Sequence, residues 1–455
     1  MSRRLALAAA TLALAACAPE QSSVAPVYLD NSLDARANTV VESASHAVVR
    51  NTDNDGAGSL RAAIARANTS SAVRVIQFVE GLGTIRLSSP IEYTGTQPLE
   101  INGVDAVIDA AGVGANGDGI RVTAGASLTV TQLTVQNSPQ EGIDISVPAT
   151  ATGVVHLVLD GVTIRGNKGH GVLLNDQVTP DVGEGEPDPR GSDASVHVQL
   201  RRTRFLDNGY SVSDRDGLRV NEGGNGYLQL VADDVWANDN AADGIELDER
   251  GNGNVFVQVT NTQILRNGKL DPNDLDDGFD IDETNDGDIV GFLRNVNASD
   301  NYEEGLDFNE NHAGDLRVDL YSVVANNNGE EGIDYEEDDD FAGGGELVSA
   351  MVDITANGNG KNGGDGGLKI REKGVGSLSV DLTRVRADNN KVTGVDIRET
   401  EAGNLLARLE TVFASTNAGR GVRVRQESTG FGQVSSLNVF GTGNTNPLIE
   451  TSGVN

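Results

Sequence analysis

The chain has 455 residues, of which 68 are acidic and 34 basic, so its formal net charge is −34. A surface of that charge attracts cations or basic partners and repels nucleic acid and anionic lipid, which argues against a nucleic-acid function. With 56 glycines and 4% aromatic residues, the composition suits tight turns and slim stacked side chains rather than a bulky aromatic core.

The N-terminus has the pattern of an export signal. Met1 to Arg4 contains two arginines, Leu5 to Leu14 is an apolar run too short to span a bilayer, and a small-residue segment then leads to Cys17, the single cysteine. This start resembles the lipobox of bacterial lipoproteins, in which the cysteine becomes the lipidated first residue of the mature chain. Ala18 follows where an aspartate would signal inner-membrane retention, so the resemblance implies an anchor in the outer membrane, facing the periplasm or the cell surface. The alternative is a signal peptide with an incidental cysteine.

The rest of the chain divides by composition. We expect a signal peptide, a flexible tether rich in Ala, Ser, Pro, Asn and Gln, an N-terminal cap with the first coils, a long repeat region and a C-terminal tail, over residues 1–17, 18–47, 48–110, 111–445 and 446–455. Within the cap, Ser59 is placed to begin a short helix that runs to about Asn68. Short strands are expected to follow the helix.

A repeat dominates the chain from residue 119 onward. Eleven glycines are each followed by apolar, any and apolar residues: Gly119, Gly142, Gly171, Gly217, Gly244, Gly278, Gly305, Gly332, Gly367, Gly394 and Gly421. From Gly217 onward most neighbours are 27 residues apart, with two longer steps of 34 and 35. A fixed period of this length indicates one supersecondary unit stacked many times.

Within each unit the apolar residues alternate with period two, as Val395 and Ile397 do after Gly394. Two to three short strands per 27 residues correspond to one coil of a parallel β-helix, whereas leucine-rich repeats need a helical segment and propeller blades need longer repeats. The region resembles the right-handed parallel β-helix family, which includes pectate-lyase-like enzymes and bacterial surface adhesins. We therefore predict an all-β, right-handed parallel β-helix with a short N-terminal capping helix.

The repeat also predicts two structural columns. Asparagines four residues before the repeat glycine would hydrogen-bond to the backbone and to one another: Asn167, Asn240, Asn301, Asn328, Asn390 and Asn417. The apolar pair after each glycine, such as Ile245 and Leu247, would face the core.

Acidic residues follow the same register. Seven units carry a glutamate five residues after the glycine, and the second, fourth and fifth positions are expected on one outward face. Like carboxylates about 4.8 Å apart on neighbouring coils repel, so protonation, a cloud of monovalent ions or bound divalent cations must compensate. Oxygen-rich clusters suit Ca²⁺, and the expected ligands are Asp280, Asp282, Glu283, Asp307, Glu310, Asp334, Glu336 and Glu337. The alternative is a solvated acidic face.

Beyond Gly367 the outward positions become basic, with Lys369, Arg371 and Arg398. In pectate-lyase-like enzymes a Ca²⁺ lies near an Arg or Lys that acts as a base on an acidic sugar. The resemblance therefore implies an alternative function, a Ca²⁺-dependent polysaccharide lyase with these three residues as catalytic groups. The principal expectation is a lipid-anchored surface protein that binds or adheres to a polysaccharide or another cell-surface partner, with no catalytic residues.

Overall fold

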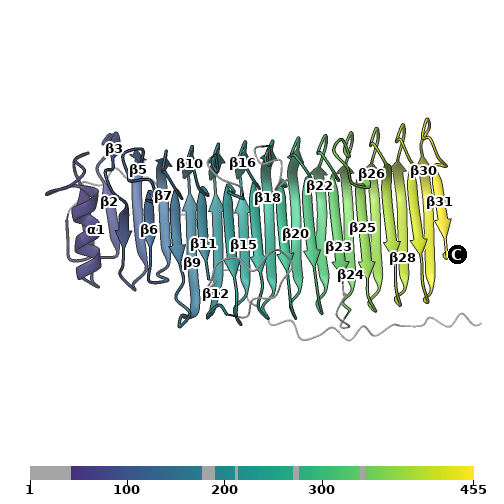
Figure 1. Ribbon diagram of the computed structural model, residues 1–455, viewed down its shortest axis with the longest axis horizontal. Coiled ribbons are helices and arrows are strands. Elements are labelled where there is room, and N and C mark those ends of the chain that lie inside the picture. The colour runs from purple at the N-terminus through teal and green to yellow at the C-terminus, as the bar shows by residue number, and fades with distance from the viewer. Residues whose placement is uncertain (1–41, 177–189, 211–213, 270–275, 339–343) are drawn as a thin grey trace, which may run out of the picture. The chain divides into compact units, whose positions relative to one another are not determined.

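The computed structural model describes residues 42–176, 190–210, 214–269, 276–338 and 344–455. These residues form a parallel β-solenoid whose coils stack in one direction (Figure 1). The predicted fold class is confirmed. Cys17 and most of the predicted tether lie outside the described residues.

One side of every coil belongs to a parallel sheet that we call the glycine sheet, because most of its strands follow a repeat glycine. Its 13 strands are β4 (Ile91–Tyr93), β6 (Ile120–Val122), β8 (Ile143–Ser146), β11 (Val172–Asn175), β14 (Leu218–Glu222), β17 (Ile245–Glu249), β19 (Phe279–Glu283), β21 (Leu306–Glu310), β23 (Ile333–Asp338), β25 (Gly366–Lys373), β27 (Thr393–Glu399), β29 (Val422–Gln426) and β31 (Ile449–Ser452). The last strand, β31, lies in the segment 446–455. The expectation of a C-terminal tail there is wrong, because these residues pair in register with β29.

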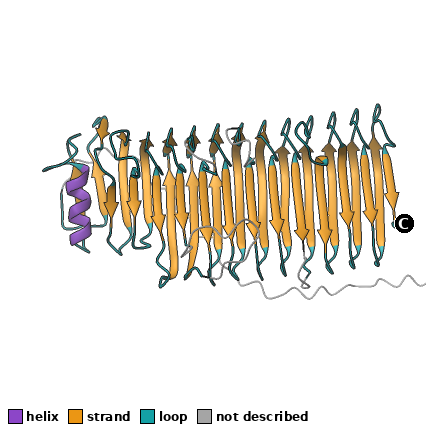
Figure 2. Cartoon of the chain, viewed as in Figure 1, coloured by secondary structure: helices purple, strands orange, loops and turns teal. Residues whose placement is uncertain are grey.

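A second sheet of 18 strands forms the remainder of the coils (Figure 2). Its strands are β1 (His46–Val49), β2 (Val75–Phe78), β3 (Thr84–Arg86), β5 (Leu99–Asp109), β7 (Leu128–Gln136), β9 (Thr152–Asp160), β10 (Thr163–Arg165), β12 (Asp193–Arg201), β13 (Arg204–Leu206), β15 (Leu228–Asp233), β16 (Trp236–Asn238), β18 (Val255–Leu265), β20 (Ile289–Ser299), β22 (Leu316–Val324), β24 (Leu347–Thr355), β26 (Leu378–Arg386), β28 (Leu405–Phe413) and β30 (Gly432–Phe440). Its long strands bend where one residue takes a positive φ, as at Asn261 in β18 (52°) and Asn295 in β20 (56°). Asparagine tolerates this region better than most residues, so the bend divides the second sheet into two sides.

The helix α1 (Leu60–Thr69) covers the first coils at one end of the solenoid (Figure 1). Ser59 caps it as predicted, because its Oγ accepts a hydrogen bond from the backbone N–H of Ala62 at 3.2 Å. Leu60 and Ile64 lie on its buried face. Within the described ranges, no helix is both long enough and apolar enough to cross a membrane.

The core is a continuous column of the predicted inward residues. Ile245 and Leu247 are fully buried, and so are their equivalents in the neighbouring coils. Phe279 and Phe308 contact edge-to-face and Phe308 stacks on Tyr335 in successive coils, with centroids 5.3 and 5.1 Å apart. Such stacking adds about 0.5–1.5 kcal/mol per pair to the free energy of burial.

The repeat glycines are required by close approach between coils. A Cβ on Gly244 would lie 2.6 Å from the carbonyl oxygen of Gly278 and 2.7 Å from Nδ2 of Asn267. Equivalent contacts surround the other repeat glycines, and none of them needs a positive φ. Any side chain at this position would therefore push neighbouring coils apart.

The predicted asparagine column is confirmed and is longer than expected. Each amide in the middle coils bonds to the next, as Asn240 Nδ2 donates to Asn267 Oδ1 at 3.1 Å and Asn267 Nδ2 donates to Asn301 Oδ1 at 3.1 Å. The prediction missed Asn208, Asn267 and Asn359, because they stand nine, eleven and eight positions before their glycines instead of four.

Candidate functional site

The seven repeat glutamates lie inside the solenoid, and their expected place on an outward face is wrong. The fully buried residues are Glu222, Glu249, Glu283, Glu310, Glu337, Glu372 and Glu399. The strands continue through the fifth position after the glycine, so alternation places that side chain on the same side as the two core residues. We call this set the glutamate column.

The glutamate column is a row of carboxyl groups in contact. Glu249 bonds to Glu222 on one side and to Glu283 on the other. Several of the glutamates also close the turn that follows their strand: Glu249 Oε1 accepts from the N–H of Gly251 at 2.9 Å, and Glu337 Oε1 accepts from the N–H of Gly345 at 2.9 Å. On β29, at the end of the column, Gln426 replaces the acid and donates to Glu399 Oε2 at 2.9 Å.

Burial keeps these carboxyl groups protonated. Loss of solvent raises the pKa of Glu222 to about 11, of Glu337 to about 10 and of Glu310 and Glu372 to about 8. A protonated carboxyl group donates to its neighbour, so the column holds together as shared acid protons rather than as stacked anions. Protonation, one of the three expected remedies for repulsion, therefore operates in the interior.

A second column of glycines runs beside the glutamate column, and the repeat pattern alone did not predict it. A glycine stands four residues after most of the buried glutamates, including Gly253, Gly287 and Gly314. A Cβ on any of these would overlap the carbonyl oxygen of the preceding coil's glycine. The spacing Glu-x-x-x-Gly, repeated in register, was the signal that the glutamate turns inward against a turn of bare backbone.

The outward side of the glycine sheet carries the remaining acidic residues. Glu246, Asp280, Asp307 and Asp334 occupy the second position after the glycine and face one another in register on β17, β19, β21 and β23. Burial raises the pKa of all four carboxyl groups well above the usual range. These groups share a desolvated surface, and Glu246 also bonds to the carboxylate of Asp216.

The residues immediately before the repeat glycines complete this surface. Asp216, Asp243 and Asp277 each accept a hydrogen bond from the backbone N–H at the same position of the next coil, at 3.0, 2.5 and 2.7 Å. One oxygen of each carboxylate is thus fixed by the stacking. Their side chains lie beside the carboxylates at the second position.

Several of these acids approach closely enough to hold a metal ion. The groups of three whose ligand oxygens lie within 4.8 Å of one another are Asp214, Asp216, Glu246; Asp243, Glu246, Asp280; Asp277, Asp280, Asp307; Asp277, Glu303, Glu304; and Glu304, Glu330, Glu331.

Only part of the predicted ligand set is found in these groups. Of the eight predicted ligands, Asp280 and Asp307 are brought together. The others do not belong to any such group in the part of the chain that the structure describes: Asp282, Glu283, Glu310, Asp334, Glu336 and Glu337. Glu283, Glu310 and Glu337 are absent because they point into the core. The prediction left out Asp243 and Asp277, although their place before a glycine in the acidic coils marked them.

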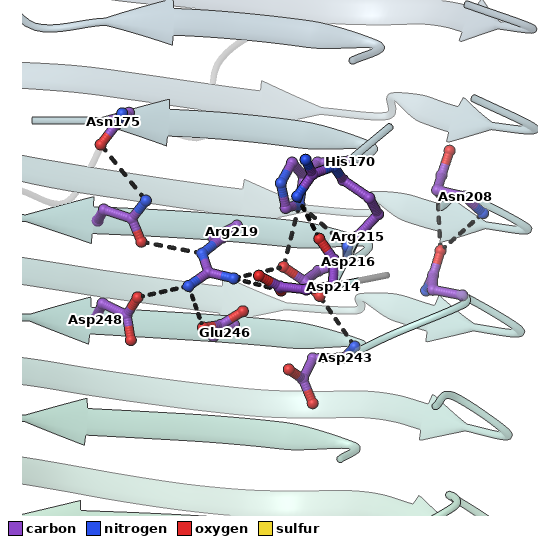
Figure 3. Close-up of polar contacts among 12 residues, drawn as sticks. His170, Asn175, Asn208, Asp214, Arg215, Asp216, Arg219, Asp243, Glu246 and Asp248 are labelled. Atoms are coloured by element: carbon purple, nitrogen blue, oxygen red, sulfur yellow. Dashed lines mark hydrogen bonds and ion pairs between the residues drawn. The ribbon is translucent and has the colours of Figure 1, made fainter. Parts of the chain in front are cut away.

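A buried arginine organises one end of the acidic surface (Figure 3). Arg219 on β14 contacts Asp214 Oδ1 at 2.5 Å, Glu246 Oε1 at 2.8 Å and Asp248 Oδ2 at 3.0 Å. Its side chain is 6% exposed, and the surrounding carboxylates raise its pKa further. The sequence gives few grounds to expect this centre, because Arg219 is one arginine among many.

His170 lies next to the same centre, before Gly171. Its Nδ1 is 3.1 Å from Asp216 Oδ2 and accepts a hydrogen bond from the backbone N–H of Asp216 at 3.1 Å. Burial lowers the pKa of His170, so the ring is neutral at pH 7. The pair is buried within the stack and links two neighbouring coils.

The other end of the acidic surface is closed by the basic residues of β25. Lys369 Nζ lies 2.7 Å from Asp334 Oδ2 and also contacts Glu336, which pairs with Arg371 as well. Arg398 lies 3.2 Å from Asp396. Ion pairs raise the pKa of Lys369, whereas a lysine base needs a lowered pKa. The three residues of the lyase alternative therefore sit in ion pairs, across strands for Lys369 and Arg371 and within β27 for Arg398, an arrangement that does not favour base catalysis.

Comparison with known proteins identifies no family for this chain. No family model and no curated protein sequence matches the chain. Two solved structures of PfbA, a surface adhesin of Streptococcus pneumoniae, are similar. The first has 10% identity, a TM-score of 0.29 and coverage of 87% of this chain and 90% of that one. The second has 11% identity, a TM-score of 0.26 and coverage of 87% and 95%. At these values the likeness carries no inference about function.

Proposed function

We propose that this protein is a binding or adhesive β-solenoid of the bacterial cell envelope, anchored to the outer membrane through lipid on Cys17, with Ca²⁺ on its acidic face. The observation that carries the cation is local. Among the residues that the structure describes, no Lys or Arg forms an ion pair with Asp280 or Asp307, although one oxygen of each carboxylate is shielded from solvent. The pattern around Cys17 supports the anchor.

Electrostatics favour a divalent cation for this face. Two carboxylates one coil apart repel by about 1 kcal/mol in water and by about 3–4 kcal/mol at an effective dielectric constant near 20. Every candidate ligand in these groups is a carboxylate oxygen, which suits Ca²⁺, whereas zinc prefers imidazole and thiolate. A bound divalent ion would offset several of these repulsions at once.

A thermal unfolding experiment tests the cation. At low ionic strength we expect millimolar CaCl₂ to raise the unfolding midpoint of the purified protein, and EDTA to reverse the shift. NaCl at equal ionic strength is the control, since simple screening would act equally well in either salt. A midpoint that follows ionic strength alone would leave a solvated acidic face as the explanation.

Metabolic labelling tests the anchor independently. A radioactive fatty acid should label the native protein and not a Cys17→Ser variant, and the variant should leave the membrane fraction. If both proteins take up label equally, lipidation at Cys17 is wrong. Binding partners, a polysaccharide or another cell-surface molecule, can then be sought with the anchored protein.

A further inference from the structure

We infer that the acidic surface contains two adjacent divalent-cation sites that share one carboxylate, that of Asp280. The first site would use Asp243, Glu246 and Asp280, and the second would use Asp277, Asp280 and Asp307. This inference rests on the cation-binding face proposed above and adds its ligand set and its number of ions.

The two groups have the same construction. Each takes the residue before a glycine, the residue two after it, and the residue two after the next coil's glycine. In both groups the ligand oxygens lie within 4.8 Å of one another. The coil repeat therefore generates one site and then a second one further along the stack. Asp280 on β19 belongs to both groups. In the first group it is the residue two after the next coil's glycine, and in the second it is the residue two after the first glycine.

Three residues of these groups carry a buried oxygen without a hydrogen-bond partner. Glu246 is 3% exposed, and its Oε2 accepts no hydrogen bond while Oε1 contacts Arg219. Oδ1 of Asp280 and Oδ1 of Asp307 are also shielded from solvent and unbonded. A buried charged oxygen without a partner is costly, so each of these atoms calls for a proton or a positive ion.

The chain supplies its own cations at both ends of the same row. Arg219 occupies the second position after the glycine on β14, directly beside Glu246 in the register. Lys369 occupies the equivalent position on β25, beside Asp334. Positive charge therefore already sits in this row where the sequence provides it. The coils between Arg219 and Lys369 carry carboxylates at that position, and a bound ion would supply the positive charge there.

The ligand chemistry indicates a hard divalent cation, with Ca²⁺ as the probe. Three carboxylates supply part of its six to eight oxygen ligands, and water would complete the shell. Mg²⁺ demands a tighter octahedral arrangement and should bind more weakly.

Equilibrium dialysis of the native protein and three variants against CaCl₂ tests the shared ligand. We expect Asp280→Asn to bind two fewer ions per chain than the native protein. Asp243→Asn and Asp307→Asn should each bind one fewer. Asp353→Asn is the matched control, because this exposed carboxylate pairs with Arg384 on the second sheet and its loss should leave the number of ions unchanged.

A second readout separates ion binding from simple removal of charge. Without Ca²⁺, Asp280→Asn should raise the unfolding midpoint because it removes repulsion. With Ca²⁺, it should lower the midpoint relative to the native protein because two ions are lost. Circular dichroism checks that each variant keeps its strands.

The outcomes distinguish this inference from the proposed function. If Ca²⁺ stabilises the native protein but Asp280→Asn loses no ion, or loses only one as Asp307→Asn does, the shared site is wrong and the cation-binding face remains. If the native protein binds no Ca²⁺, both are wrong. A midpoint of Asp280→Asn that rises equally with and without Ca²⁺ would show that protons, and not ions, neutralise these carboxylates.

Discussion

Gly244 illustrates how a single residue type fixes the distance between coils. The strands approach because neither glycine presents a side chain to the carbonyl oxygen of the next coil. The sequence predicted the position of these glycines, and the reason emerges only from the stacked backbones. The same contact that excludes a methyl group leaves room for the amide of Asn267.

Gly244→Ala should therefore destabilise the solenoid strongly. A methyl group there must displace backbone, and overpacking of this kind costs about 1–3 kcal/mol. Thermal unfolding followed by circular dichroism would measure the loss. Gly114→Ala is the control, because no atom lies within 4 Å of the position of its Cβ and its φ is not positive. Equal midpoints for the two variants would contradict the packing explanation.

The alternation of single residues along each strand predicted the core better than it predicted the polar columns. Alternation identified Ile245 and Leu247 correctly, and the same rule applied to Glu249 would have turned it inward. The prediction failed there because a charged residue was taken to end the strand at the surface. Hydropathy alone does not show that a carboxyl group will be protonated; the neighbours that desolvate it come from other coils.

The strands of the glycine sheet form an ordered series of charges. Arg219 on β14 and Lys369 on β25 border a purely acidic row, and both make ion pairs with the strand next to them. The sequence predicted the change of sign at Lys369. It did not predict the role of Arg219, because the carboxylates around it come from the preceding loop and from the neighbouring strand β17.

Lys369→Met should destabilise the junction between β23 and β25. It leaves the carboxylates of Asp334 and Glu336 without their ammonium partner, and we expect a loss of about 2 kcal/mol, reduced from that of a fully buried pair because the Lys369 side chain is 20% exposed. Ca²⁺ should restore part of the midpoint, since the variant leaves the carboxylates of Asp334 and Glu336 available to bind it. Arg384→Met, which breaks an exposed pair with Asp353, should leave the midpoint unchanged. A Lys369→Met midpoint equal to that of the native protein would contradict the role of this pair.

The solenoid as a whole is held by columns that run through successive coils. Its 13-stranded sheet, at about 4.8 Å per strand, corresponds to a length on the order of 60 Å. Because each coil contacts its neighbours, the stability of the whole is the sum of similar interfaces. The glutamate column adds a dependence on pH to those interfaces.

Stability should fall as the pH rises from about 5 to about 8. Burial raises the folded-state pKa of Glu372 and of Glu310 to about 8, above the ordinary 4.5 of a glutamate, so the folded protein binds more protons than the unfolded chain in this window. Each such group lowers the free energy of unfolding by about 1.4 kcal/mol per pH unit until it ionises. Unfolding midpoints measured across this range in Ca²⁺-free buffer would show the slope.

Glu372→Gln should flatten that slope, because glutamine keeps the shape and cannot ionise, as Gln426 already does on β29. Glu410→Gln, at a half-exposed position beside Arg408, should leave the slope as it is. If the two variants share the native slope, the buried glutamates do not carry the pH dependence.

The coils differ in length, and the positions of the extra residues indicate where such a chain can accept insertions. The extra residues before Gly217, Gly278 and Gly367 all fall between the column asparagine and the glycine. Gly345 follows Glu337 by eight residues, whereas most of the other buried glutamates are followed by a glycine after four. These extra residues fall just after a strand of the glycine sheet. Insertions thus occur at the two borders of the glycine sheet, and the strands and columns keep their register. New loops can be gained, lost or exchanged beside the acidic row without refolding the stack. The surroundings of that row are therefore the part of the molecule that is easiest to alter.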